Sequence, residues 1–376
     1  MKSLLLLLLK TKLREKPDEY LLRNSGLTMI ELLVGVIMAF LILTPLLTFV
    51  VDVLNTEKRE QIKTATEQEL QTGLDYIAKD LQQAIYIYDA DAINTGTLPA
   101  PASANPIKAQ LPPTAAISGE ANCTTTGNCT PILVFWKRKV VKNAVPFQRA
   151  PNSQTQPALT CQNNPPAGQC DDTYILSLVA YYLIKDNTST WCQPSGGTCP
   201  ARITRFEISD GIGNPFFDAT QPSTGTTGAN PQYVKGPDEG YQSFVLPIDF
   251  KTWKKDPNTP YSKNQKTTVL LNYLDPSTQN VPAQTTQSCK QALGVDQTYM
   301  TNNSLTDANF APLTDNQSHS FVACVDSNRN TARIFLRGNA LRRLQANAPY
   351  NPNNPAYFPT VSIQVQGRSG FGKASQ

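Results

Sequence analysis

The stretch Ser25–Phe40 reads SGLTMIELLVGVIMAF, and it decides how the rest of the chain is organised. It leads into a run of twenty uncharged residues, Leu32–Val51, which as a helix would be about 30 Å long. That length matches the hydrocarbon core of a bilayer, so the sequence predicts one transmembrane helix. Glu31 stands directly before the run, where a carboxylate costs a few kcal/mol to insert and therefore needs a partner of opposite charge.

Charge is distributed unevenly along the 376 residues. Six of the 33 Lys and Arg and three of the 29 Asp and Glu lie in the first 26 residues, so the rest of the chain carries a net charge of only +1. Cations that precede a membrane span keep their side of it in the cytoplasm. Nucleic-acid binding usually needs a basic face, so no nucleic-acid partner is expected for this nearly neutral chain.

All eight cysteines follow the apolar run, on the side that these charges place outside the cytoplasm. Their even number and close spacing favour disulfides formed in an oxidising compartment. A metal site is disfavoured because His319 is the only histidine and no Cys-x-x-Cys pair occurs. The sequence leaves other connectivities open, but Gly- or Pro-bearing loops within the first three couples favour nearest-neighbour pairing. The predicted pairs are Cys123–Cys129, Cys161–Cys170, Cys192–Cys199 and Cys289–Cys324.

Gly26, Leu27 and Glu31 form a recognisable pattern with the residues around them. This pattern resembles that of precursors in the type IV pilin family. Those precursors have a charged leader that ends in Gly, then an apolar residue, a Glu four residues beyond it and an apolar helix. The resemblance implies that a prepilin peptidase cuts between Gly26 and Leu27 and that the Leu27 amine is N-methylated. It also implies that Glu31 neutralises such an amine on a neighbouring subunit during assembly, since buried opposite charges offset part of each other's desolvation.

The pattern departs from the family in two respects. Leu27 stands where Phe is commoner, and the leader of 26 residues is longer than most. Pro45 lies within the apolar run, as a proline often does in pilin helices. Because proline removes one helical hydrogen bond and clashes with the preceding turn, it is expected to kink or locally melt the helix.

Apolar residues continue beyond the span at intervals of three and four, which predicts that one helix runs from Leu27 to Tyr88 over roughly 90 Å. The expected organisation has four parts. Residues 1–26 are a cytoplasmic leader that is removed, 27–54 a transmembrane or filament-core helix, 55–93 an amphipathic helix that packs on the head, and 94–376 a β-rich head outside the cytoplasm.

Segments rich in Val, Ile, Tyr, Phe and Thr between turn residues predict the strands of the head. An antiparallel sheet packed on the long helix is the economical arrangement. The fold class is therefore predicted to be α+β, resembling the pilin fold, with disulfide-stapled loops. The predicted strands are Ile132–Val141, Tyr174–Ile184, Ile203–Ser209, Gln242–Ile248, Thr267–Leu274, Thr331–Leu336 and Val361–Gln366.

Longer segments also resemble known pilin-like proteins. Gly73–Ile93 looks like the corresponding helix of large minor pseudopilins, and VAYYLIKD (Val179–Asp186) with CPARITRFEISDG (Cys199–Gly211) resembles central strands of large minor subunits in type IV pili and type II secretion. TARIFLRGNALRRL and YFPTVSIQVQGRSGF, from Thr331 onward, are similar to the hormogonium polysaccharide secretion pseudopilins of filamentous cyanobacteria.

These resemblances imply a minor pilin or pseudopilin that serves polysaccharide secretion and gliding motility. Its partners would be other pilin subunits, the prepilin peptidase and the inner-membrane assembly platform, with polysaccharide as a further candidate. It would cross the plasma membrane once, with the N-terminus cytoplasmic and the head periplasmic, and become part of an extracellular filament on assembly.

Residues that could support other chemistry are few. A lone His319 cannot form a His metal site or supply the other members of a catalytic triad, and it is expected in a surface loop. Asp326–Asn330 (DSNRN) begins like a calcium loop, but Thr331 replaces the turn glycine and Arg337 the distal glutamate, so a hairpin turn is predicted. No catalytic residue, metal or cofactor is predicted, and the chain is not expected to be an enzyme.

Three further groups receive structural interpretations. The arginine cluster is predicted to be a solvated helix face rather than a polysaccharide or lipid contact. The tryptophans are expected in core or loop packing rather than stacked on sugars, and the acidic loop is not expected to bind calcium. These groups are Arg337, Arg342 and Arg343; Trp136, Trp191 and Trp253; and Asp210, Asn214 and Asp218.

Two other function classes stay open. A tip adhesin would bind a glycan or surface through the loops at 94–130 or 220–240. A membrane-tethered extracellular hydrolase would need acid and base residues that converge in space.

Overall fold

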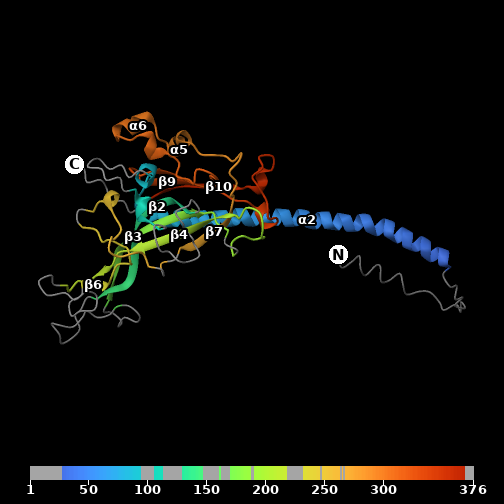
Figure 1. Cartoon of the computed structure of the whole chain (residues 1–376), viewed down its shortest axis with the longest axis horizontal. Coiled ribbons are helices and arrows are strands. Elements are labelled where there is room, and N and C mark those ends of the chain that lie inside the picture. Colours follow the sequence, from blue (N-terminus) through green and yellow to red (C-terminus); the bar gives the residue numbers. More distant parts are fainter. Residues whose placement is uncertain are drawn as a thin grey trace, which may run out of the picture. The chain divides into compact units, whose positions relative to one another are not determined.

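A computed structural model describes residues 28–94, 106–112, 129–146, 161, 170–187, 190–217, 232–245, 248–262, 265 and 267–368. Contacts within the chain divide it into two units, Met1–Lys58 and Arg59–Gln376. The described part has one long apolar helix near its N-terminus and an antiparallel sheet, which is an α+β layout (Figure 1).

Helix α2 (Met29–Gln82) has 54 residues and is therefore about 80 Å long. Its first half exposes its side chains, and burial begins at Thr66. From there a stripe of mostly apolar residues at helical spacing enters the core of the second unit, as the pattern of threes and fours predicts. The buried residues of α2 are Thr66, Leu70, Gly73, Leu74, Ile77, Ala78, Asp80 and Leu81.

The helix ends earlier than predicted. After Gln82 the chain turns, and Ala84–Ile87 forms strand β1, which pairs antiparallel with β2 (Cys129–Pro146). The prediction of helix through Tyr88, and of helix across Gly73–Ile93, is therefore wrong for residues 83–89, and Ala90–Asn94 forms a separate short helix, α3. The alternating Ile and Tyr of this segment favour a strand over a helix, and the Tyr88 amide donates to the Val134 carbonyl at 3.0 Å.

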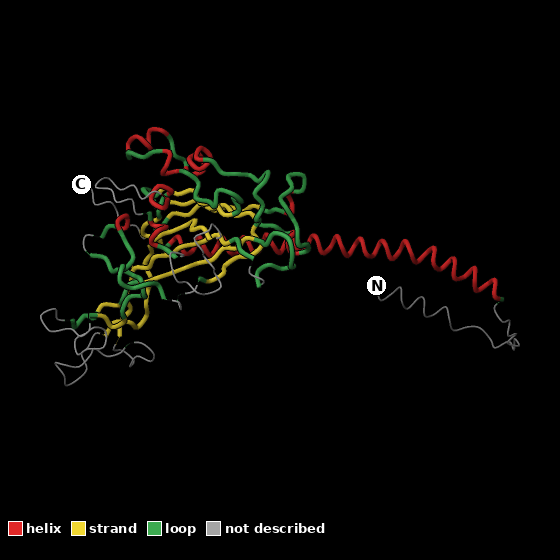
Figure 2. The backbone as a smooth tube through the Cα atoms, viewed as in Figure 1, coloured by secondary structure: helices red, strands yellow, loops and turns green. Residues whose placement is uncertain are grey.

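The strands form two main antiparallel sheets, which gather around the C-terminal part of α2 (Figure 2). The larger sheet has the order β1-β2-β3-β4-β7, the smaller has the order β10-β9-β8, and β5 pairs with β6. The remaining strands are β3 (Cys170–Ile184), β4 (Ala201–Ser209), β5 (Ile212–Gly213), β6 (Tyr233–Lys235), β7 (Thr268–Leu274), β8 (Phe321–Asp326), β9 (Thr331–Arg337) and β10 (Thr360–Gln366).

Six of the predicted strands are confirmed, with β2 and β3 longer at their ends. The prediction for Gln242–Ile248 is wrong, because its described residues form no strand and Phe244 instead packs against Trp136. Strand β8 was not predicted, although its run of buried residues is typical of a central strand. Short helices accompany the sheets: α3 (Ala90–Asn94), α4 (Ile107–Gln110), α5 (Thr286–Leu293) and α6 (Gln297–Asn302).

One core joins α2 to both sheets. Leu74 and Ile77 of the helix lie in the same buried cluster as Phe135 of β2, Tyr181 of β3 and Ile334 of β9. Burial of such side chains contributes about 1.5–3 kcal/mol each. The second unit therefore has a hydrophobic core of its own, which includes the C-terminal part of α2.

The disulfide predictions are confirmed for three pairs, Cys161–Cys170, Cys192–Cys199 and Cys289–Cys324. Cys289–Cys324 joins α5 to β8 inside a smaller buried cluster. Cys129 is also disulfide-bonded, but its predicted partner Cys123 lies outside the described residues, so that pairing stays a prediction.

Gly73 lies where α2 packs against β7 of the larger sheet. A Cβ atom at this position would lie 2.3–2.7 Å from side-chain atoms of Leu271 in β7. We expect Gly73→Ala to destabilise the chain by about 1–3 kcal/mol, because the Leu271 side chain would have to leave its position to make room for the methyl group. The midpoint of urea unfolding, followed by tryptophan fluorescence of the full chain in detergent, measures the change.

Gly35 provides the matched control, since a Cβ there would meet nothing within 4 Å. Gly35→Ala is expected to leave the same midpoint unchanged. Equal midpoints for both variants would contradict the tight packing at Gly73.

Candidate functional site

The start of α2 places Glu31 in a defined position. The Glu31 amide donates to the Thr28 carbonyl at 3.0 Å and to Thr28 Oγ1 at 3.3 Å, so Thr28 caps the helix. Glu31 lies in the first turn, and its side chain is exposed. The positive end of the helix dipole favours a carboxylate there. Gly26 and Leu27 lie outside the described residues, so cleavage and methylation stay predictions.

The first half of α2 is apolar and uncovered by the described chain. Large side chains such as Phe40, Ile42 and Leu41 are 70%, 65% and 63% exposed. The helix is long and apolar enough to cross a membrane, and none of its most apolar window is buried. So large an exposed apolar surface requires lipid or a protein partner in place of water.

Pro45 lies in the middle of this apolar segment. Helix α2 is continuous through Pro45, so the expected local melting does not occur, and the kink stays a prediction. Two threonines beside it bond back to the preceding turn: Thr44 Oγ1 donates to the Phe40 carbonyl at 2.8 Å and Thr48 Oγ1 to the Thr44 carbonyl at 3.0 Å. These bonds keep the hydroxyl groups satisfied within an apolar surface.

A buried cluster of charges joins the other half of α2 to the larger sheet. Asp80 accepts hydrogen bonds from Lys137 Nζ (2.7 Å), Tyr181 Oη (2.8 Å) and Arg205 Nε (2.7 Å), one residue from each of β2, β3 and β4. Glu207 adds a second carboxylate, 3.5 Å from Lys137 and bonded to Arg205. The arrangement fixes the helix on three strands at once. No sequence pattern predicted this cluster.

Glu207 and Asp315 predict how the second unit responds to acid. Burial raises the pKa of Glu207, but Lys137 and Arg205 outweigh it and lower that pKa from 4.5 to about 2. Burial also raises the pKa of Asp315, and Lys185 outweighs it, lowering the pKa from 3.8 to about 2. A carboxyl group whose pKa is lower in the folded chain than in the unfolded chain stabilises the fold. This stabilisation is complete at a pH above the unfolded-chain pKa, and it is lost as the pH falls through the folded-chain pKa. We therefore expect the temperature of thermal unfolding to decrease as the pH is lowered from about 4.5 to about 2.

Asp315→Asn tests this pH dependence. The variant should unfold at a lower temperature at pH 7, where the ionised carboxylate accepts from Lys185 Nζ at 2.7 Å. Its midpoint should also fall less between about pH 4.5 and pH 2, because one of the titrating groups is gone. The same fall in variant and wild type would contradict the assignment.

The arginine cluster is not a solvated helix face, and that prediction is wrong. Arg337 and Arg342 are buried, at 4% and 1% exposure. Arg337 Nε bonds Asp275 at 3.0 Å, and Arg342 donates to main-chain carbonyls, Thr198 among them. Arg343 forms an ion pair with Glu69 of α2. All three hold loops or the helix together, because buried guanidinium groups need acceptors.

The other candidates mostly follow their structural interpretations. The segment Asp326–Asn330 forms a hairpin, as predicted, with the turn at Ser327–Asn330 between β8 and β9, and Asn330 has a positive φ of 49°. Trp136 and Trp253 are buried in one aromatic cluster, while Trp191 is half-buried beside Arg202. His319 lies half-buried in a loop between Thr314 and β8.

The acidic loop has its polar groups engaged within the protein. Asp210 accepts from Gly211 and Ser243, and Asn214 accepts from Phe216, while Asp218 lies outside the described residues. Within residues that the structure describes, no group of three or more His, Cys, Asp or Glu is arranged to hold a metal ion.

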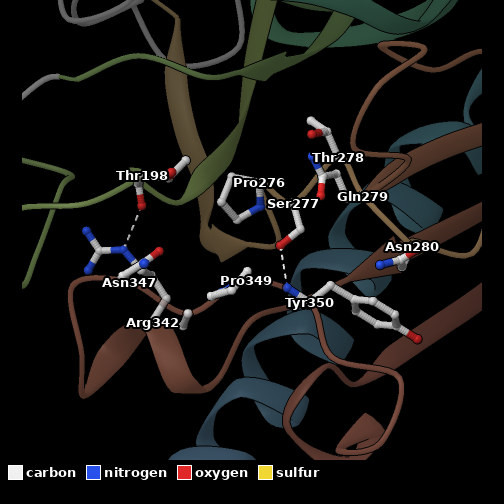
Figure 3. Close-up of a pocket in the computed structure, with 11 residues that line it drawn as sticks. Thr198, Pro276, Ser277, Thr278, Gln279, Asn280, Arg342, Asn347, Pro349 and Tyr350 are labelled. Atoms are coloured by element: carbon white, nitrogen blue, oxygen red, sulfur yellow. Dashed lines mark hydrogen bonds between the residues drawn. The ribbon is translucent and has the colours of Figure 1, made fainter.

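A cavity of about 460 Å³ lies between the loop after β7 and the loop that precedes β10 (Figure 3). Hydroxyl and amide side chains line it, including Thr278, Gln279 and Asn347. Some of its polar groups are already bonded, since Ser277 Oγ accepts from the Tyr350 amide at 2.7 Å. Its hydroxyl, amide and guanidinium groups can offer hydrogen bonds to a polar ligand.

Comparison of the chain with protein-family models, curated protein sequences and solved structures found no match.

Proposed function

We propose that this chain is a minor pseudopilin, a structural subunit of a type IV pilus-like or type II secretion-like filament. The observation that supports the proposal best is Glu31: an exposed carboxylate in the first turn of a long helix whose apolar side chains are uncovered. The helix dipole favours a carboxylate there, but inserting it beside lipid still costs free energy unless an opposite charge lies nearby. In a subunit that docks against a neighbour, the neighbour's N-terminal amine supplies that charge.

The second unit supports the same proposal. The C-terminal part of α2 is buried against antiparallel strands and tied to three of them through Asp80. In the proposed filament the apolar half of the helix leaves the membrane and packs among neighbouring helices, while the head remains fixed on the other half.

The finer assignment rests on resemblance alone. The similarity of Thr331–Leu344 and of the segment around β10 to hormogonium polysaccharide secretion pseudopilins supports a role in polysaccharide export and gliding motility. The partners would then be other pilin subunits, the prepilin peptidase and the assembly platform. The chain would act as a structural subunit and not as an enzyme.

The mass of the mature N-terminal peptide tests the proposal. The expected result is a peptide that begins at Leu27 and carries one added methyl group on its amine. Gly26→Val, which places a bulky side chain at the cleavage site, should retain the leader. An intact Met1 in the wild-type protein, or cleavage at another bond, would reject the pilin assignment.

The two rival functions have their own tests. An adhesin would bind immobilised glycan through loops at 94–130 or 220–240, most of which lie outside the described residues. A hydrolase would keep its activity when residues 1–58 are removed. Neither rival excludes the membrane anchor, so these tests concern the head alone.

A further inference from the structure

Strand β10 is the outer strand of the smaller sheet, beside β9 (Figure 1). Two hydrogen bonds beside its ends show which of its residues direct their main-chain groups toward β9. The Gly338 amide donates to the Pro359 carbonyl and the Gly367 amide to the Asn330 carbonyl, both at 2.9 Å. The register between them is continuous, without a bulge. In an antiparallel pair every second residue bonds the neighbouring strand and those between point their main-chain groups outward. The outward residues, called here the edge residues, are Thr360, Ser362, Gln364 and Gln366.

The edge residues have free main-chain groups. No described residue donates to their carbonyls or accepts from their amides. Natural proteins usually protect such an edge with Lys, Pro, a bulge or a covering segment. Within Thr360–Gln366 there is no charged residue, no proline and no bulge. The edge is therefore open to pairing with another strand.

The side chains on the core face of β10 indicate that a strand added beside it would have apolar side chains on that face. Val361 and Ile363 point toward the core but are only half-buried. Beside Val361 lies a groove of about 400 Å³ between Glu67 and Gln71 of α2 and the start of β10. Apolar side chains of an incoming strand would cover the exposed parts of these two residues, as cross-strand neighbours do.

The opposite face carries an unpaired positive charge. Arg333 of β9 stands directly beside Gln364 in the register. Its guanidinium lies 5.6 Å from the centre of the Phe335 ring, and its buried Nε has no hydrogen-bond partner. No carboxylate of the described chain lies within ion-pair distance of it. An acidic residue on the next strand, across Gln364, would be within reach of this long side chain and would complement its charge.

We propose that the edge of β10 binds an extended segment of a different protein. That segment alternates apolar residues, which cover Val361 and Ile363, with polar residues, one of which is an Asp or Glu that pairs with Arg333. A second copy of β10 does not fit, because the strand has no acidic residue. The inference does not rest on the proposed assembly role of Glu31.

Photo-crosslinking of the full chain in its native membrane tests the proposal. A p-benzoylphenylalanine residue replaces Gln364, and mass spectrometry identifies the cross-linked peptide. The matched control carries the same probe at Tyr174 of β3, a side chain that is 67% exposed. We expect the Gln364 probe alone to capture one extended segment of another protein, with an acidic residue next to the cross-linked position.

Two variants separate the proposed contacts from unspecific capture. Ser362→Pro removes an outward amide without removing a bond to β9, and it should lower the cross-link yield about tenfold. Arg333→Glu should lower it by a similar factor, since it repels the partner's carboxylate. Both variants should fold and keep a cooperative thermal transition. If Ser362→Pro lacks that transition, the Arg333→Glu variant alone tests the proposal, because it leaves the main chain unchanged.

Several results would overturn the proposal. These are a product that maps to this chain itself, whether within one molecule or to a second copy, the same product from the Tyr174 probe, or no product at all. A yield that is unchanged in both folded variants would also overturn it.

Discussion

Replacing Glu31 with glutamine is expected to lower incorporation of the chain into filaments at least about tenfold, while membrane insertion and folding of the head stay unchanged. Glutamine keeps the size of the side chain but cannot offset the charge of a neighbour's N-terminal amine in an apolar environment. Leaving one buried charge unpaired costs about 3–5 kcal/mol, which is more than a tenfold change in an equilibrium. The ratio of the chain in sheared filaments to that in membranes, measured by immunoblot, gives the result.

Asp75→Asn is the matched control for Glu31→Gln. Asp75 is an exposed carboxylate on the same helix, so the substitution makes the same change of charge outside the apolar segment. It should leave incorporation unchanged. N-terminal masses of both variants separate an effect on assembly from an effect on processing. Incorporation of correctly processed Glu31→Gln at the wild-type level would refute the electrostatic account of assembly.

The sequence predicted the parts of the fold that have strong periodicity or strong chemistry. The uncharged run Leu32–Val51 is long enough to predict a long apolar helix, and α2 contains it. Strands such as β3 and β10 combine β-branched and aromatic residues with turn residues at both ends. Two of the disulfides followed from close spacing of their cysteines, whereas Cys289 and Cys324 are 35 residues apart and were paired as the remaining neighbours.

Errors arose where tertiary contacts decide the outcome. The helical period continues past Gln82 in the sequence, yet Ala84–Ile87 leaves the helix because β2 offers a strand partner for it. Phe244 lies in a segment with the composition of a strand, but it packs against Trp136 from a loop. Local pattern cannot tell these alternatives apart, since the competing partner is more than forty residues away in the chain.

Buried charge was the least predictable feature. Arg337 and Arg342 resemble a solvated cluster in the sequence, and only the fold shows their acceptors in Asp275 and in main-chain carbonyls. Asp80 offered one usable signal. It lies three residues after Ile77 and next to Leu81, within the apolar stripe of α2, so a charge at that position required a buried partner.

Asp80→Ala is the second substitution with a large expected effect. Asp80 is 7% exposed and is bonded to both Lys137 and Arg205. In the variant, these two positive charges would share Glu207 as their remaining buried carboxylate. Removing one member of a buried charge network destabilises by about 3–5 kcal/mol, because the remaining charges cannot regain water. Urea unfolding of the full chain in detergent measures the loss, since all three tryptophans lie beyond Lys58.

Two comparisons show whether the loss comes from unpaired charge. Glu69→Ala breaks the ion pair with Arg343, but the Glu69 side chain is 49% exposed, so the expected loss is below about 1 kcal/mol. Adding Lys137→Met to Asp80→Ala should recover part of the stability, because the buried Arg205 keeps Glu207 as its partner and the half-exposed Lys139, which also pairs with Glu207, stays in contact with water. If the double variant is less stable than Asp80→Ala alone, packing and not unpaired charge accounts for the role of Asp80, and α2 is held on the sheet by its apolar stripe.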